Sequence, residues 1–324
     1  MNDKEKIKIS FVIPAYNEEN FISQCLNSIL NEIKKEKISA EVIVVNNNSS
    51  DKTKEIVSNF KNVLIVDEKK QGLTFARQAG FLKSRGELIA NIDADTILTD
   101  KWIKTVIEEF DNNKNLVALS GPQIYYDVDK KILIGEKIFY FIAYLTYLIN
   151  KHILNIGSMI QGGNFIVRRE ALLKIGGFNT NILFWGEDTD IAKRLHKIGD
   201  VKFTFKLPIY ASGRRLKREG VLKTAWRYTL NYFYILFFDK PFHNEIKLNS
   251  NNNFLKFNKI YQIQINENKL KLIIKTSFVL FIVMVYILIY SYIHNGFVYD
   301  KIVKLKFEIA EIKNNLNEIY LKIK

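Results

Sequence analysis

Hydrophobic residues in the first part of the chain fall into short runs separated by stretches with a helical pattern. The runs predict strands at Ile7–Ile13, Glu41–Val45, Val63–Val66 and Leu88–Ile92. The stretches between them predict helices at Asn20–Lys35, Asp51–Phe60 and Thr74–Ser84. Such alternation indicates an α/β domain with a mostly parallel sheet and helices on both faces. Ligands of these sheets bind beyond the carboxyl ends of the strands, so functional residues are expected in the segments that follow each strand.

Three apolar segments further along have other patterns. Thr276–Tyr299 has 24 residues without a formal charge, and a helix of that length, roughly 36 Å, predicts a membrane span. Ile138–Ile149 and Tyr228–Phe238 are too short to span, and their aromatic and basic composition fits helices in the plane of a membrane interface. Buried core helices explain these two runs equally well, so both interpretations stay open.

The C-terminal segment repeats apolar side chains at steps of three and four. The positions are Ile302, Leu305, Ile309, Ile312, Leu316, Ile319 and Ile323. A seam of about three heptads predicts either a coiled coil, through which the protein would form a homo-oligomer, or one amphipathic helix on the membrane.

Charge and composition exclude several classes of protein. The 48 Lys and Arg residues exceed the 34 Asp and Glu residues, which leaves a formal net charge of +14. This balance suits a polyanionic ligand, an anionic membrane surface or nucleic acid, although a lysine-rich solvated surface would give the same charge. The single cysteine, Cys25, excludes a disulfide framework, and the four histidines are too far apart for a two-histidine zinc motif.

Polar residues follow each of the four predicted strands and are expected at one edge of the sheet. They are Pro14, Ala15, Tyr16 and Glu18, then Asn46 to Thr53, then Gln71 to Leu73 with Arg77, and finally Asp93 to Asp95. Neither a GxGxxG motif nor a P-loop is present, so phosphates must be held in another way. Asp93 and Asp95 point to the same side of an extended segment and can bind Mg²⁺ or Mn²⁺ together with substrate phosphates.

Six segments together resemble a known family. They are VIPAYNEE, NNSSDKT, GLTFARQAG, IDADT, GGNFIVRREALLKIGGF and WGEDTDIAKRL. In this order and spacing the chain resembles the family 2 glycosyltransferases over residues 7–213. The resemblance implies a GT-A fold, which is a Rossmann-like domain, a nucleotide-diphosphate-sugar donor, a divalent metal and inversion at the anomeric carbon.

The resemblance also implies roles for individual residues. Pro14, Ala15, Tyr16, Glu18, Asn46, Arg77 and Asp93 would contact the nucleotide, Asp93 and Asp95 would bind Mn²⁺ or Mg²⁺, and Asp188 in the Glu187–Asp188 pair would be the catalytic base. Apart from the resemblance, substrate contacts are expected at Gly163, Asn164, Trp185, Arg214 and Arg215, with the Trp185 ring placed to stack on a sugar face. Asn46 departs from the family because an Asp is usual there, although the Asn carbonyl still accepts a hydrogen bond. Arg214 and Arg215 stand where many members have a His, and their guanidinium groups suit either the diphosphate or anionic lipid headgroups.

The resulting hypothesis is a membrane-anchored glycosyltransferase that acts on a hydroxyl of a lipid-linked or membrane-proximal glycan. A polyprenyl-phosphate acceptor is the near alternative, because a phosphate needs no base. A sugar-1-phosphate nucleotidyltransferase would need a Gly-rich loop after the first strand, and this chain does not have one. A non-catalytic membrane protein would not need Asp93, Asp95 and Asp188. The expected partners are the donor, the acceptor and the membrane, and no nucleic acid.

Four regions follow from these patterns. They are a catalytic domain at 1–213, basic and aromatic interfacial helices with a linker at 214–268, a transmembrane helix at 269–299 and a heptad-patterned tail at 300–324. With no signal sequence before it, the catalytic domain is expected in the cytoplasm, attached to the cell membrane by a single span. Five lysines precede the span and four follow it, so charge barely favours this orientation.

Overall fold

The computed structural model of the protein describes residues 6–151 and 159–242. The chain divides into two compact units, Met1–Ile246 and Lys247–Lys324, and every described residue belongs to the first. The predicted span at Thr276–Tyr299 and the heptad segment at 300–324 lie outside the described residues. No helix within the described ranges has both the length and the apolar character needed to cross a membrane.

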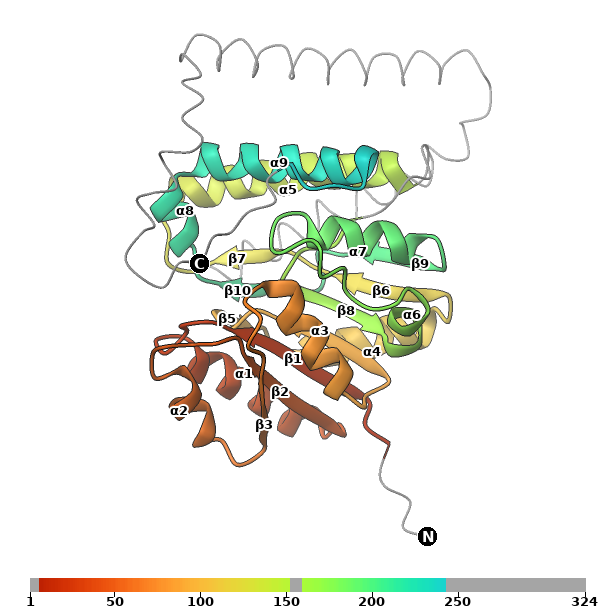
Figure 1. The fold of residues 1–324 in the computed structure, drawn as a ribbon. Coiled ribbons are helices and arrows are strands. Elements are labelled where there is room, and N and C mark those ends of the chain that lie inside the picture. Colours follow the sequence, from red (N-terminus) through yellow and green to blue (C-terminus); the bar gives the residue numbers. More distant parts are fainter. Residues whose placement is uncertain (1–5, 152–158, 243–324) are drawn as a thin grey trace, which may run out of the picture. The chain divides into compact units, whose positions relative to one another are not determined.

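The larger sheet of the described domain has seven strands in the order β3-β2-β1-β4-β8-β6-β9 (Figure 1). Their bounds are β1 Ile9–Ala15, β2 Ala40–Asn46, β3 Val63–Asp67, β4 Leu88–Ile92, β6 Leu116–Ser120, β8 Asn164–Arg168 and β9 Asp200–Phe203. β1 pairs in parallel with β2 and β4, β2 with β3, and β6 with β9. β8 alone among these strands is antiparallel to its neighbours, β4 and β6. The predicted mostly parallel sheet is therefore confirmed.

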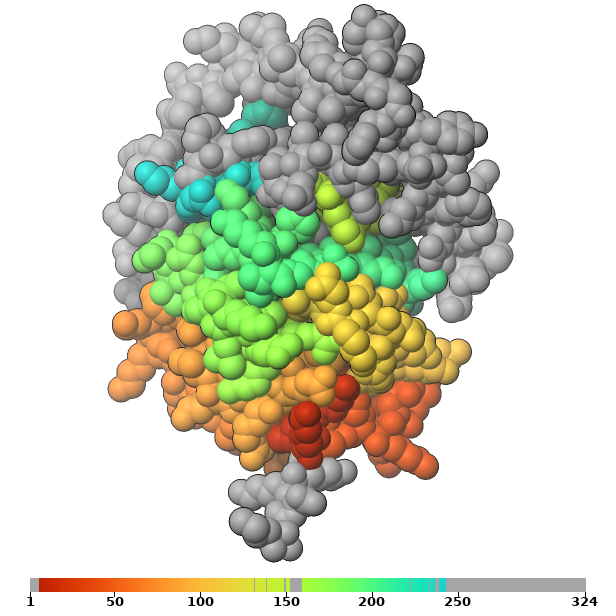
Figure 2. Space-filling model, turned by 90° about the vertical axis from the view of Figure 1, so that its right-hand side faces the viewer, coloured from red at the N-terminus to blue at the C-terminus, as the bar shows by residue number. Residues whose placement is uncertain are grey.

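Helices cover both faces of this sheet because successive side chains of each strand point to opposite faces. On one face, α1 (Ile22–Glu36), α2 (Thr53–Ser58) and α4 (Trp102–Asn112) pack on side chains such as Phe11 and Ile13. On the other, α3 (Leu73–Lys83), α6 (Arg169–Lys174) and α7 (Glu187–His196) pack on side chains that include Val12 and Ile43. Figure 2 shows the green segment that holds α6 and α7 against the orange segment that holds α3.

A smaller sheet of three short strands adjoins the carboxyl edge of the larger one. Its order is β5 (Thr96–Leu98), β10 (Ile209–Ala211) and β7 (Gln123–Tyr125). β10 runs antiparallel to β5 and parallel to β7. Because β5 begins just after Asp95 and β10 ends just before Arg214, this sheet brings those two residues to the same place.

Two long helices, α5 (Lys130–Ile149) and α9 (Val221–Phe238), lie along one side of the domain, and the short helix α8 (Arg214–Glu219) leads into α9 (Figure 1). Asn150, which follows α5, donates a hydrogen bond to the Tyr232 hydroxyl of α9. Both helices begin earlier than the apolar runs, α5 eight residues before Ile138 and α9 seven residues before Tyr228. Tyr140, Tyr144 and Tyr147 of α5 are buried and other large side chains of it are exposed, so the helix is half core and half surface.

Candidate active site

The loops that follow β1 and β2 are joined to each other by hydrogen bonds from backbone N–H groups to short polar side chains. The Asn17 N–H donates to Ser49 Oγ at 3.1 Å, and the Glu18 N–H donates to Thr53 Oγ1 at 2.7 Å. In return, Asn17 Oδ1 accepts from the Ser50 N–H at 2.8 Å. These contacts, which we call the loop clamp, fix Pro14 to Glu18 next to Asn46 at the carboxyl edge of the sheet.

Both polar atoms of the Asn46 side-chain amide form hydrogen bonds with neighbouring residues. Its Nδ2 donates to Asp67 Oδ1 at 2.8 Å, and its Oδ1 accepts from the Ser49 N–H at 3.2 Å. The bond from Asn46 and the ammonium group of Lys54 lower the pKa of Asp67. The sequence did not single out Asp67, which lies beside Asn46 in the register of β2 and β3.

Arg77 on α3 links the metal-binding motif to the proposed catalytic pair. Its Nη2 lies 3.3 Å from Asp93 Oδ1, and its Nη1 lies 3.1 Å from Glu187 Oε1. The side chain is only 1% exposed and its guanidinium stacks over the Phe165 ring at 5.3 Å. This arginine therefore joins residues that are 94 positions apart in the sequence, Asp93 and Glu187, into one site.

Gly162 and Gly163 let the backbone approach these carboxylates closely. Gly163 has a φ of +77°, and a Cβ built on it would collide with the Asp93 carboxylate. A Cβ on Gly162 would lie 3.4 Å from Glu187 Oε1, 3.6 Å from Asp188 Oδ2 and 3.8 Å from Arg77 Nη2. The two glycines thus mark the point where the acidic side chains converge. For Gly163 this assigns a positioning role in the site.

The Glu187–Asp188 pair begins α7 and is deeply placed. Burial, with the neighbouring charge of Asp188, raises the pKa of Glu187 to about 8, against the opposing effect of Arg77. Burial also raises the pKa of Asp188, which is opposed by the Thr189 N–H that donates to Asp188 Oδ1 at 2.7 Å. A carboxylate with a raised pKa is a better proton acceptor at neutral pH, as a general base requires.

Arg214 is the second arginine among the site carboxylates. Its guanidinium pairs with Glu18 Oε1 and lies 3.2 Å from Asp95 Oδ2. Burial raises the pKa of Glu18 to about 7 although Arg214 opposes this, and burial together with Asp93 raises the pKa of Asp95 to about 6. Arg77 and Arg214 therefore each bridge two carboxylates at the edge of the sheet.

Arg215 and Trp185 belong to a group of stacked side chains that also contains Phe184, Arg227 and Tyr228. Arg215 stacks over Phe184 at 4.6 Å and donates to the Tyr228 hydroxyl at 2.8 Å, and Arg227 stacks over Trp185 at 5.0 Å. Trp185 is 8% exposed within this aromatic–arginine cluster. The structure therefore does not present its ring face to a sugar, contrary to expectation, and Arg215 contacts rings rather than the carboxylates.

Asn164 was expected at the substrate, and the structure corrects this. Its side chain is completely buried and fully bonded, with Nδ2 donating to the carbonyls of Pro122 and Leu207 and Oδ1 accepting from Trp102 Nε1. Asn164 therefore supports the scaffold behind the site. A residue that the sequence did not reveal is Asp127, which accepts from the Gly213 N–H and Ser212 Oγ and so fixes the start of α8.

The predicted metal motif offers carboxylate oxygens, but the described residues do not supply a full set of ligands for a metal ion. In the ranges that the structure describes, no group of three or more His, Cys, Asp and Glu side chains is arranged to hold an ion. Asp93 and Asp95 share one strand end, and Glu18 Oε2 is buried there with no hydrogen-bond partner among the described residues. Mg²⁺ and Mn²⁺ often use one or two carboxylates and take their other ligands from substrate phosphates and water. The residues therefore fit a cation that binds together with a diphosphate.

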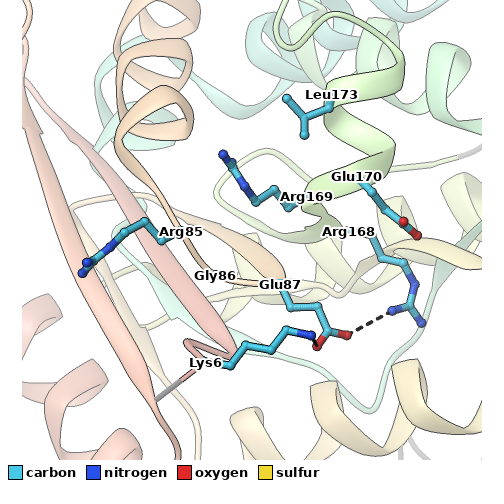
Figure 3. A pocket seen from close by; sticks show the side chains of 8 residues that line it. All are labelled: Lys6, Arg85, Gly86, Glu87, Arg168, Arg169, Glu170 and Leu173. Carbon is cyan, nitrogen blue, oxygen red and sulfur yellow. Dashed lines mark hydrogen bonds and ion pairs between the residues drawn. The ribbon is translucent and has the colours of Figure 1, made fainter. Parts of the chain in front are cut away.

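A separate hollow of about 430 Å³ lies at the opposite end of β4 and β8 (Figure 3). Glu87 sits there between Lys6, Lys8 and Arg168, at 3.9, 3.2 and 3.5 Å. None of the residues that line it was predicted at the site. This ion-pair network ties the amino end of β4 to the carboxyl end of β8.

These features define a Rossmann-like glycosyltransferase domain of the GT-A type. The family profile described as Glycosyl transferase family 2 matches residues 10–176, and one described as N-terminal domain of galactosyltransferase matches residues 150–210. The chain belongs to glycosyltransferase family 2, as its motifs predicted.

Curated relatives agree with this assignment. The chain is 30% identical over 219 residues to the probable glycosyltransferase YdaM of Bacillus subtilis, a match that covers 61% of this chain and 49% of that protein. It is 27% identical over 239 residues to the dolichyl-phosphate beta-glucosyltransferase ALG5A of Trichomonas vaginalis, covering 69% and 72%. The match therefore spans about half the length of the first relative.

Solved structures share the fold. The mannosyltransferase PcManGT of Pyrobaculum calidifontis, solved with GDP-Man and Mn²⁺, matches with a TM-score of 0.53 at 19% sequence identity. The match covers 71% of this chain and 63% of the PcManGT chain. TarS 1–349 of S. aureus has a TM-score of 0.51 at 18% identity and covers 75% and 76%.

Proposed function

We propose that the protein transfers a sugar from a nucleotide-diphosphate-sugar to a hydroxyl group, with inversion and with Mn²⁺ or Mg²⁺ as cofactor. The observation that carries this proposal is the convergence of Asp93, Glu187 and Asp188 on Gly162 and Arg77 at the carboxyl edge of the sheet. A metal held by Asp93 and Asp95 would supply charge neutralisation for the leaving diphosphate. The nucleoside would lie along the loop clamp and Asn46.

The chain's own residues account for the chemistry of the transfer. The acceptor oxygen attacks the anomeric carbon, a C–O bond forms on one face and the bond to the diphosphate breaks on the other. Asp188 takes the hydroxyl proton as the new bond forms, which is general-base catalysis. Arg77 contacts Glu187, the neighbour of the base in the chain, and Asp93 of the metal motif, so one guanidinium joins the catalytic pair to that motif.

For the acceptor we propose a lipid-linked or membrane-proximal glycan. Six large apolar side chains that are exposed on α5, on α9 and just after α9 support a membrane-facing surface: Ile134, Phe139, Phe141, Ile142, Tyr234 and Phe242. Three exposed lysines lie on the same helices or just after α9: Lys137, Lys223 and Lys240. Exposed apolar and basic side chains on the same two helices suit the interface of an anionic bilayer. The uncharged segment 276–299 would provide the single span, with the catalytic domain in the cytoplasm and the heptad tail available for self-association.

A phosphate acceptor is the second candidate. The match to a dolichyl-phosphate beta-glucosyltransferase over 69% of this chain favours it. A phosphate oxygen needs no base, so the two candidates differ in whether Asp188 is required for turnover.

A donor panel incubated with native membrane lipids and Mn²⁺ tests the reaction, with products identified by mass spectrometry. We expect one nucleotide sugar to yield a glycosylated lipid and free nucleoside diphosphate. Absence of any product and of nucleoside-diphosphate release across the panel would contradict the proposal.

A thiol label tests the membrane-facing surface. Because the single native cysteine, Cys25, is buried, an environment-sensitive dye can be placed at Phe141→Cys on α5, with Leu82→Cys on α3 as the control. The native side chains are 46% and 66% exposed. With the full chain in vesicles of phosphatidylglycerol, the emission at position 141 should shift to the blue and that at position 82 should not. Equal spectra at both positions would rule out this surface.

A further inference from the structure

The two arginines that bridge the site carboxylates differ in their freedom to move. Arg77 is 1% exposed and is fixed between Asp93, Glu187 and the Phe165 ring. The Arg214 side chain is 40% exposed and reaches Glu18 and Asp95 from the first residue of the short helix α8. Only the second arginine can leave its carboxylates without opening the core.

The backbone at Arg214 is held in place while the side chain is not. Asp127 accepts from the Gly213 N–H and from Ser212 Oγ, which anchors the residues just before α8. The guanidinium of Arg214 rests over the Phe21 ring at 4.7 Å. A long side chain on a fixed backbone can turn from one partner to another nearby at little cost in folding energy.

Arg214 forms an ion pair with Asp95, one of the two carboxylates of the predicted metal motif. Its Nη2 lies 3.2 Å from Asp95 Oδ2, and the same guanidinium pairs with Glu18. A divalent cation that binds Asp95 would carry the same sign of charge as Arg214 and would need the same carboxylate. Arg214 in this position therefore competes with a metal ion.

We propose that Arg214 is an exchangeable counter-ion: it pairs with Glu18 and Asp95 in the free enzyme and moves to the donor diphosphate when the metal and nucleotide bind. This inference rests on the proposed function for the identity of the donor and metal, and it adds how their binding is coupled. Arginine forms two parallel hydrogen bonds with phosphate oxygens as readily as with carboxylates, so the exchange keeps the guanidinium paired.

The exchange has a thermodynamic consequence. A metal ion that binds alone must displace Arg214 and leave it without an anion. A metal ion that binds with a nucleoside diphosphate supplies the anion that Arg214 needs. Arg214 therefore weakens the binding of metal alone and strengthens the binding of nucleotide with metal, which makes the two bind cooperatively.

Titration calorimetry on the full chain in detergent micelles tests this. The probes are MnCl₂ alone and then UDP, GDP or dTDP at saturating Mn²⁺. Arg214→Ala should bind Mn²⁺ alone several-fold more tightly than wild type and bind the preferred nucleotide about tenfold more weakly, within the usual range for coupled sites. Arg214→Lys, which keeps the charge without the planar fork, should fall between the two.

Lys217→Ala is the matched control, because it also removes a positive charge from α8. The Lys217 ammonium lies 3.6 Å from Asp127 and does not pair with the metal motif. It should bind both probes as wild type does. Circular dichroism and thermal melting establish that each variant is folded.

The outcomes separate this inference from the proposed function. Wild-type protein that binds none of the three nucleotides with Mn²⁺ would overturn both. Wild-type binding with Arg214→Ala unchanged, or weaker, toward Mn²⁺ alone would overturn the counter-ion exchange and leave the proposed function standing.

Discussion

The loop clamp and the aromatic–arginine cluster border the same active site but are held together by different forces. In the loop clamp, backbone N–H groups donate to hydroxyl and amide oxygens of residues 32 to 35 positions away, for example from Glu18 to Thr53. In the cluster, guanidinium groups stack on rings, as Arg227 does on Trp185. Hydrogen bonds are directional and hold one geometry, whereas ring and cation contacts tolerate small shifts.

This difference separates two tasks. A nucleotide is a constant part of the donor, and a rigid hydrogen-bonded edge suits its recognition. In the proposed reaction the acceptor would enter on the side formed by α7, α8 and α9, and stacked contacts would allow that side to adjust. Substitutions in the carboxylate site between these regions should therefore have the largest effects, and single contacts of the loop clamp the smallest.

Asp188→Asn should produce the largest effect on the reaction. Removal of a general base lowers turnover by roughly 10²- to 10⁴-fold, while the affinity for the nucleotide should stay nearly constant. Nucleoside-diphosphate release and calorimetry measure the two quantities. Asp190→Asn on the same helix, whose partner is Arg194 at 2.7 Å, is the control and should retain activity. Near-wild-type turnover of Asp188→Asn would favour the phosphate acceptor.

Gly163→Ala should disturb the metal motif directly. A Cβ there collides with the Asp93 carboxylate, and the φ of +77° disfavours any L side chain. We expect a loss of roughly 1–3 kcal/mol in the free energy of unfolding and loss of Mn²⁺-dependent nucleotide binding. Gly176→Ala is a matched control, because Gly176 has a φ of +76° and no atom within 4 Å of the added Cβ. If both variants bind Mn²⁺ and nucleotide as wild type does, the contact with Asp93 is unimportant.

Glu187→Gln should change how stability depends on pH. The pKa of Glu187 is raised from 4.5 to about 8 by burial, so between these values the folded state binds more protons than the unfolded state. Its contribution to stability therefore falls as pH rises through that window. The melting temperature of the variant should fall less than that of wild type between pH 5 and pH 8.5, by roughly 3 °C or more. Glu170→Gln, on the exposed side of α6, should follow the wild-type curve, and parallel curves for all three proteins would refute the shift.

Thr53→Val should have the smallest effect, confined to the loop clamp. It removes the acceptor of the Glu18 N–H at 2.7 Å, which costs roughly 1 kcal/mol of stability. Chemical denaturation measures the loss, and nucleotide affinity should fall modestly with it. Thr105→Val, whose hydroxyl donates an exposed hydrogen bond to the carbonyl of Lys101 just before α4, should be nearly neutral. An equal loss in both variants would show that the clamp is not special.

The predicted ends of the strands and helices in the first 92 residues lie within two residues of the observed ends. These elements could be predicted because their hydrophobic periodicity is local. β1, for instance, was expected at Ile7–Ile13 and is found at Ile9–Ala15. The four polar clusters were also expected at one edge, since that follows from parallel strands. The family motifs then assigned the chain correctly.

Long-range contacts were harder to predict. Nothing near Asn164 reveals that Trp102, Pro122 and Leu207 surround its amide. In the same way, nothing near Trp185 reveals that its ring is covered by Arg227 of α9 and so is not free to stack on a sugar. Asp127 lies in no motif, and its role appears only when β7 and β10 are paired. The residues within the strand ends were therefore predictable, and the residues that hold them from a distance were not.

The reversed direction of β8 determines where the chain tolerates changes in length. The first residue of β8, Asn164, borders the active edge beside Ile92, and its last, Arg168, lies at the far edge beside Leu88. Insertions just before Gly163 would displace the carboxylates of the candidate site, whereas an insertion near Leu173, an exposed residue of α6, would lie at the opposite end of the sheet. A short insertion near Leu173 should therefore lower turnover less than one of the same length placed just before Gly163.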